Sequence, residues 1–250
     1  MGLFDSAADQ YDAARPSYPE GLYDVVESVT GPFDGKIVGD GGAGTGVVAR
    51  QLLERGAQVV AFDPGREMLK RARFRSPCLP VVVADATAAP FRAASLDVLC
   101  FGQSWHWLDQ DSGAEEAARL LRPGGWWAAW WNEPWADAEP WFEQYAALLE
   151  DRCHGFSLDQ RDVDWCADAV RNNHDFQDPS RHVVEWERIV SVENWLTDLE
   201  SHSYVIAMSP AQRRGLLSDS EAILRRHFAD RMVVPYQARL WLARRRLATA

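Results

Sequence analysis

The stretch Lys36-Ile-Val-Gly-Asp-Gly-Gly-Ala-Gly-Thr-Gly-Val-Val-Ala-Arg50 decides the fold of this chain. It starts apolar, passes through a run of glycines and continues from Val47 with residues that favour a helix. This order predicts a strand, a tight turn and the start of a helix. Glycine allows positive φ angles and a close approach of a ligand to the backbone. The first helical turn offers unpaired N–H groups and a positive dipole end. The stretch therefore predicts a site for a nucleotide-like cofactor.

The spacing of the glycines narrows the type of cofactor. They fall at positions 42, 44 and 46, which gives G-x-G-x-G, with Asp40 just ahead of the turn. The dinucleotide fingerprint is G-x-G-x-x-G, and a phosphate-binding Walker loop ends in G-K-[ST]. Neither pattern fits, so a nicotinamide oxidoreductase and a P-loop nucleotidase are both disfavoured.

Strand and helix patterns alternate along the first half of the chain. Strands are expected at 57–62, 79–84, 96–101 and 126–131, and helices at 20–29, 46–55, 66–73 and 114–121. Such alternation predicts βαβ units and a parallel sheet. Further on, we expect helices at 140–152, 192–201 and 210–228, an irregular segment at 153–180 and a strand at 181–190. A last strand is expected at 232–241, with Pro235 confined to an edge or a bulge.

Five ordered features resemble the class I S-adenosylmethionine-dependent methyltransferases. The first is the motif Val38-Gly-Asp-Gly-Gly-Ala-Gly-Thr-Gly46, which follows that family's pattern of strand, acid and G-x-G-x-G. Asp63, Met68, Asp85-Ala86 and the run Leu121-Arg-Pro-Gly-Gly125 follow in the family's order. Gly39 and Gly41 depart from the family, which commonly has bulkier apolar residues there. An extra glycine weakens a strand by roughly 0.5–1 kcal/mol.

The resemblance implies an α/β fold: a Rossmann-like, doubly wound, seven-stranded and mostly parallel sheet with its last strand antiparallel. It implies one methyltransferase domain over residues 1–250. Within it we expect an arm and helix at 1–30, a cofactor-binding core at 31–135, an acceptor cap at 136–210, and a C-terminal helix and edge strand at 211–250.

The resemblance also implies S-adenosyl-L-methionine as cofactor, S-adenosyl-L-homocysteine as product, and a set of binding residues. Asp63 would hold the ribose hydroxyls, Met68 would pack on the adenine face, and Asp85 would lie at the adenine edge. Each has a structural alternative, as a helix cap, a core residue and a turn residue respectively. The expected cofactor-binding residues are Tyr11, Arg15, Tyr18, Asp40, Gly42, Ala43, Gly44, Gly46, Asp63, Pro64, Met68, Asp85, Ala86 and Gln103.

The N-terminal residues Tyr11, Arg15 and Tyr18 resemble the Y-x-x-x-R-P-x-Y arm of a subgroup that includes trans-aconitate methyltransferase. In that subgroup the arm folds over the cofactor. Arg15 would then pair with the methionyl carboxylate of the cofactor. The alternative is a solvated terminal segment.

The segment Gly102-Gln-Ser-Trp-His-Trp-Leu108 also resembles that subgroup. His106 would donate to an acceptor carboxylate or remove a proton from an acceptor hydroxyl; a structural histidine is the alternative. We expect Trp105, Trp107, Trp131 and Trp135 to wall the acceptor pocket. The expected reaction is O-methylation of a small molecule, with a carboxylate ahead of a hydroxyl. A non-catalytic protein that binds S-adenosylmethionine is the other alternative.

Composition excludes several other classes. The 250 residues carry a formal net charge of −11, which argues against nucleic acid and anionic membrane surfaces as partners. Four scattered cysteines without a C-x-x-C pair suggest reduced thiols and a cytoplasmic protein. No standard zinc spacing occurs, so no metal is expected. Twelve tryptophans, five of them between Trp126 and Trp135, suit a pocket for an organic molecule. We expect a monomer or a homodimer.

Overall fold

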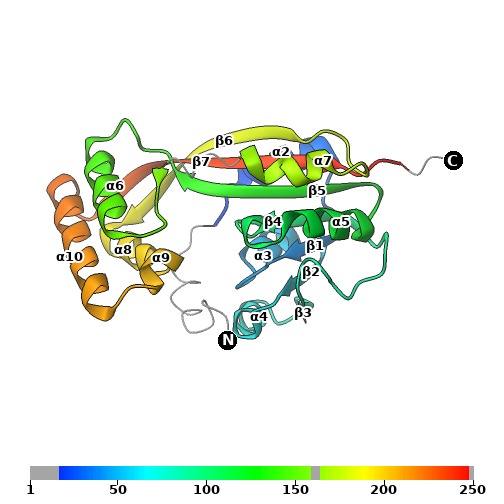
Figure 1. The fold of residues 1–250 in the computed structure, drawn as a ribbon, viewed down its shortest axis with the longest axis horizontal. Helices are drawn as coiled ribbons and strands as arrows, with labels where there is room; N and C mark the ends of the chain where they lie inside the picture. The colour runs from blue at the N-terminus through cyan, green and yellow to red at the C-terminus, as the bar shows by residue number, and fades with distance from the viewer. Residues whose placement is uncertain (1–16, 159–163, 248–250) are drawn as a thin grey trace.

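A single seven-stranded sheet organises the chain, in a computed structural model that describes residues 17–158 and 164–247 (Figure 1). The strand order is β3-β2-β1-β4-β5-β7-β6. The strands are β1 (Ile37–Gly41), β2 (Gln58–Asp63), β3 (Val81–Val83), β4 (Leu96–Gly102), β5 (Leu121–Pro134), β6 (Ser180–Ser191) and β7 (Arg231–Arg244). Strand β7 runs antiparallel to both of its neighbours, and the other pairs are parallel. The predicted fold class is confirmed.

The position of β7 corrects one expectation. It was expected at an edge of the sheet, but it lies between β5 and β6, and β6 forms the edge. Pro235 is tolerated because its backbone faces the region where β5 ends: its carbonyl accepts a hydrogen bond from the Trp135 N–H at 2.7 Å. The missing proline N–H therefore removes no bond of the β6–β7 ladder.

Helices cover both faces of the sheet. Helices α2 (Glu20–Thr30) and α3 (Val47–Glu54) pack on one face, and Ala72 of α4 (Arg66–Arg75) joins their apolar cluster. Helix α5 (Gln110–Leu120) and the short helix α7 (Asp168–Asn172) pack on the other face, around Trp105 and Trp127. The turn Asp164–Ala167 leads into α7. These two layers leave the carboxyl ends of β1, β2 and β4 open for a ligand.

A cap gathers at the far ends of the three longest strands, on the left in Figure 1. It consists of α6 (Pro140–Arg152), α8 (Val192–Glu200), α9 (Ser203–Ile206) and α10 (Pro210–His227). Their apolar side chains form a separate cluster with the ends of β6 and β7. The predicted cap at 136–210 is therefore only partly right. Residues 164–191 contribute to the main sheet and its cover, and α10 belongs to the cap.

The two unusual glycines of β1 have a packing reason. A Cβ atom on Gly39 would lie 2.8 Å from Cδ1 of Leu96, and one on Gly41 would lie 2.5 Å from Cε1 of Phe101. Both distances are shorter than side chains tolerate, so the large residues of β4 fill the space that bulkier side chains on β1 would occupy.

Within the described residues, we find no helix with the length and apolar character that a membrane crossing needs.

Candidate functional site

A cavity of about 1220 Å³ lies between the carboxyl ends of the strands and the cap. Ligand pockets for a single small molecule commonly measure about 300–1,000 Å³. This cavity therefore has room for a cofactor and a second molecule together. The glycine turn and the ends of β2 and β3 line one part of it, and residues from the cap line another.

The glycine turn follows β1 closely. Gly42 and Gly44 have φ angles of 64° and 55°, which favour glycine. A Cβ on Gly42 would lie 2.5 Å from Cβ of Ser104, whose hydroxyl donates to the Gly41 carbonyl at 2.7 Å. Gly42, Ala43 and Gly44 line the cavity, whereas Gly46 does not. Gly46 instead allows α3 to approach α4, because its Cβ would lie 3.0 Å from Cβ of Ala72.

Asp63 joins the turn to the end of β2. Its Oδ2 accepts from the Gly44 N–H at 2.9 Å, and its Oδ1 accepts from the Gly65 N–H at 2.6 Å. Each carboxylate oxygen can accept more than one hydrogen bond, so the side chain can also hold hydroxyl groups in the cavity. Asp63 thus fits the predicted ribose contact and anchors the loop at the same time.

Asp40 lines the cavity, as its predicted place at the cofactor site requires, and it also has a structural role. It is 1% exposed, and its Oδ2 accepts from the Ala49 N–H in α3 at 3.0 Å. Burial, and to a lesser extent the nearby Asp63, raise the pKa of this carboxyl to about 8. Its carboxyl is therefore mostly protonated at neutral pH and supports the helix that carries the glycine turn.

The remaining predicted cofactor residues of β2 to β4 lie along the same cavity. Pro64, Met68, Asp85, Ala86 and Gln103 all line it. Asp85 also has the turn role noted as its alternative, since its Oδ1 accepts from both the backbone N–H and the hydroxyl of Thr87. The cavity thus brings together predicted residues from three strand ends.

Of the three predicted contacts of the arm, the structure describes Tyr18; Tyr11 and Arg15 lie outside the described residues. The backbone N–H and carbonyl of Tyr18 both bond to the amide of Gln51, at 3.2 and 2.8 Å. Its ring packs edge-on against Trp130 with centroids 5.9 Å apart. Tyr18 lines the cavity, so the chain reaches the site before entering α2.

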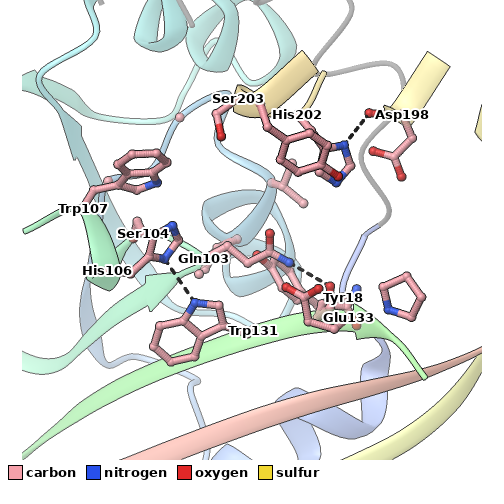
Figure 2. A pocket seen from close by; sticks show the side chains of 18 of the residues that line it. Tyr18, Gln103, Ser104, His106, Trp107, Trp131, Glu133, Asp198, His202 and Ser203 are labelled. Atoms are coloured by element: carbon pink, nitrogen blue, oxygen red, sulfur yellow. Dashed lines mark hydrogen bonds between the residues drawn. The ribbon is translucent and has the colours of Figure 1, made fainter. Parts of the chain in front are cut away.

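His106 lies in a short 3-10 turn (Trp105–Trp107) directly after β4. The indole Nε1 of Trp131, on β5, donates to its Nδ1 at 3.1 Å (Figure 2). An indole nitrogen can only donate, so Nδ1 must be the unprotonated nitrogen of the ring. The contact favours the neutral imidazole with its hydrogen on Nε2. His106 itself lines the cavity.

The four predicted pocket tryptophans separate into two pairs. Trp107 and Trp131 line the cavity. Trp105 is a correction, because it is fully buried and its Nε1 donates to the Cys166 carbonyl at 2.8 Å. Trp135 is another, because it lies outside the lining and stacks with the guanidinium of Arg239 at 4.1 Å. Contacts with residues distant in sequence, Cys166 for Trp105 and Arg239 for Trp135, decide these positions, and no local pattern predicts them.

The cap supplies lining residues that the sequence analysis did not name individually. The aromatic and aliphatic lining residues of the cap and of the β7 end beside it include Phe142, Tyr145, Leu149, Phe156, Leu158, Trp195, Leu199, Tyr204 and Tyr236. Among the cap's polar residues, Asp198 is paired with Arg188 at 2.6 Å, and Nδ1 of His202 lies 2.9 Å from the Asp198 carbonyl. Figure 2 shows His202 and Ser203 across the cavity from His106. Only long-range packing brings these segments to the glycine turn.

No group of three or more His, Cys, Asp or Glu side chains suited to a metal ion occurs in residues 17–158 and 164–247.

Comparisons with known proteins give a consistent answer. Residues 39–129 match the family model "Methyltransferase domain". An uncharacterized methyltransferase of Mycobacterium tuberculosis is 34% identical over 211 residues, which cover 84% of this chain and 80% of the relative.

Two solved structures share the fold. A proposed type II methyltransferase from Anaeromyxobacter dehalogenans matches with a TM-score of 0.69 and 24% identity, covering 93% of this chain and 97% of that one. Phosphoethanolamine N-methyltransferase 2 of Haemonchus contortus, solved with S-adenosyl-L-methionine, matches with a TM-score of 0.56 and 18% identity, covering 97% of this chain and 57% of that one.

Proposed function

This chain belongs to the S-adenosylmethionine-dependent methyltransferases, and from that premise we propose that it methylates a carboxylate oxygen of a small organic acid. The observation that carries the proposal is the hydrogen bond from Trp131 to Nδ1 of His106.

The residues of the site fit the cofactor. The positive φ angles of Gly42 and Gly44 open the turn toward the cavity, and Asp63 holds that turn while keeping acceptor capacity. Met68 and Ala86 supply apolar contacts for a base. S-adenosylmethionine, when bound, supplies a methyl group that its positive sulfur already activates. The protein's part is then to orient the acceptor and exclude water.

A carboxylate acceptor suits the state of His106. With its hydrogen on Nε2, the imidazole can donate to one carboxylate oxygen and leave the other to form the new C–O bond. A carboxylate has no proton to lose, so the reaction needs no base. The product is a methyl ester, formed as the S–C bond breaks. A neutral donor also holds the acceptor without the strong ion pair that would reduce its nucleophilicity.

A hydroxyl acceptor is the second candidate, and it makes an opposite demand on His106. To accept the hydroxyl proton at Nε2, the neutral ring must carry its own hydrogen on Nδ1. Nδ1 keeps that hydrogen in the imidazolium that forms. That hydrogen would then face the Trp131 N–H at 3.1 Å. Two donors facing each other in a half-buried site are unfavourable.

Two substitutions of His106 distinguish the candidates. Glutamine places an amide N–H close to the position of Nε2 but cannot act as a base, while phenylalanine removes the donor. For a carboxylate acceptor, we expect His106→Gln to stay within about tenfold of the wild-type kcat/KM and His106→Phe to lose about 100-fold. Labelled S-adenosylmethionine with matched panels of acids and hydroxyl compounds provides the assay.

The opposite pattern contradicts the proposal. Transfer to a hydroxyl compound only, with equal loss in both variants, would establish a base and exclude the carboxylate. Binding of S-adenosylhomocysteine by calorimetry serves as the control, because neither substitution touches the glycine turn.

A further inference from the structure

We propose that Asn132, the residue after Trp131 on β5, is a carboxylate-binding residue of the cavity, a role separate from that of His106. Asn132 lines the cavity and is 5% exposed. Its Nδ2 amide has no hydrogen-bond partner within the part of the chain that the structure describes.

The orientation of the Asn132 amide is fixed from the other side. The indole Nε1 of Trp186, on the edge strand β6, donates to its Oδ1 at 2.9 Å. Because an indole nitrogen cannot accept, the amide oxygen must face Trp186 and the NH₂ group must point away from it. The ring of Trp186 is itself held against Tyr236, with centroids 5.0 Å apart.

The backbone of Asn132 is also restrained. Its carbonyl accepts from Nε2 of Gln103 at 2.9 Å, and the Gln103 N–H donates to the Trp130 carbonyl at 2.9 Å. Gln103 adopts a φ angle of 53°, which is uncommon for a residue with a side chain. The ends of β4 and β5 are thus tied together, so Asn132 has little freedom to find another partner.

A buried amide donor without a partner is costly, and natural proteins rarely keep one without a reason. A ligand that only accepts hydrogen bonds would satisfy it, and a carboxylate does so most strongly. Two carboxylates belong in this cavity: the methionyl carboxylate of the cofactor and, resting on the proposed function, that of the acceptor. Both present the same chemistry to Asn132.

The test compares two adenosine ligands. S-adenosylhomocysteine carries the methionyl carboxylate, and 5′-methylthioadenosine lacks it. If Asn132 binds the cofactor, Asn132→Leu weakens S-adenosylhomocysteine about tenfold or more and leaves 5′-methylthioadenosine unchanged. If Asn132 binds the acceptor, the affinities for both adenosine ligands stay the same in Asn132→Leu. The variant then binds the acid more weakly by a similar factor, measured as a higher KM of an accepted acid or as a lower affinity of the acid for the S-adenosylhomocysteine complex.

The double variant Asn132→Leu/Trp186→Phe separates binding from structure. The single variant leaves the Trp186 N–H without its acceptor, whereas the double variant removes that donor too. The loss of carboxylate binding should persist in the double variant, while thermal stability recovers.

Three results overturn the inference. One is equal weakening of both adenosine ligands, and another is recovery of binding in the double variant. The third is an unchanged affinity for S-adenosylhomocysteine in Asn132→Leu when, in addition, the KM or affinity of every acid tested is unchanged or no acid binds at all. The comparison of the two adenosine ligands measures binding alone and requires no turnover. A protein that methylates no acid but shows the selective loss would therefore refute the proposed acceptor and support Asn132.

Discussion

The indole nitrogen of Trp131 lies 3.1 Å from Nδ1 of His106, and this contact joins the end of β5 to the turn that follows β4. Trp131→Phe keeps the aromatic ring and removes the N–H, so the contact that favours one tautomer of His106 is lost. We expect kcat/KM for a carboxylate acceptor to fall about tenfold with little change in cofactor affinity. Imidazole ¹⁵N NMR should show one tautomer in the wild type and a mixture in the variant.

Trp126→Phe is the matched control for that substitution, because Trp126 lies on the same strand outside the cavity lining, beside Arg244. If Trp131→Phe behaves like this control in both assays, the contact has no role in acceptor binding.

Asp63 should be the most sensitive acidic residue for cofactor binding. Asp63→Ala removes the acceptor for the Gly44 and Gly65 N–H groups as well as the predicted ribose contact. We expect the affinity for S-adenosylhomocysteine to fall by about 10- to 100-fold in calorimetry. Glu67→Gln is a suitable control, since that carboxylate pairs with Lys70 at the surface. Equal effects of the two substitutions would contradict the role of Asp63.

Asp40 should make the free protein less stable as the pH rises. Its pKa is raised from 3.8 to about 8 in the folded state, so between these values the unfolded chain releases a proton that the folded chain keeps. Stability then falls by about 1.4 kcal/mol per pH unit across this window and levels off above it.

Asp40→Asn removes this ionisation and can still accept from the Ala49 N–H. Its melting temperature, relative to the wild type, should therefore rise steadily from about pH 5 to pH 8. A constant difference in melting temperature between the variant and the wild type over that range would show that folding does not raise the pKa of Asp40.

Two glycines should respond to alanine in opposite directions. Gly42→Ala forces a side chain into positive φ and against Ser104, which should destabilise the protein by about 2–5 kcal/mol. Gly215 lies inside α10 with nothing within 4 Å of its would-be Cβ. Gly215→Ala should therefore stabilise by about 0.5–1 kcal/mol. Urea denaturation measures both, and losses of similar size would contradict the assigned cause.

Much of the sheet was predictable because its evidence is local. The apolar runs that became β1, β2 and β4, and the turn through Gly42 and Gly44, carry their signal within about ten residues. Pro235 misled for the same reason. Local rules confine proline to an edge or a bulge, but only the pairing of β7 shows that its backbone faces past the end of β5.

The cavity residues around the glycine turn were predictable from the sequence, and those on the opposite side of the cavity were less so. The positions of Asp63 and Met68 follow from their places after known motifs. By contrast, Trp105 and Trp107 differ by two positions, yet one is buried in the core and the other is 60% exposed at the cavity. His202 and Asn132 come from segments far from the glycine turn in sequence. Asn132 reaches the glycine turn through the β1–β4–β5 pairing, and His202 reaches it through the β5–β7–β6 pairing. No local pattern encodes either pairing.

The place of β7 between β5 and β6 has a consequence for how the protein is made. Among the strands that the structure describes, β6 pairs with β7 alone, although α8, α9 and α10 separate the two in the chain. During synthesis, residues 180–191 must therefore wait without a partner until residues 231–244 have left the ribosome. The glycine turn can form early, but the part of the cavity that the cap lines is assembled last.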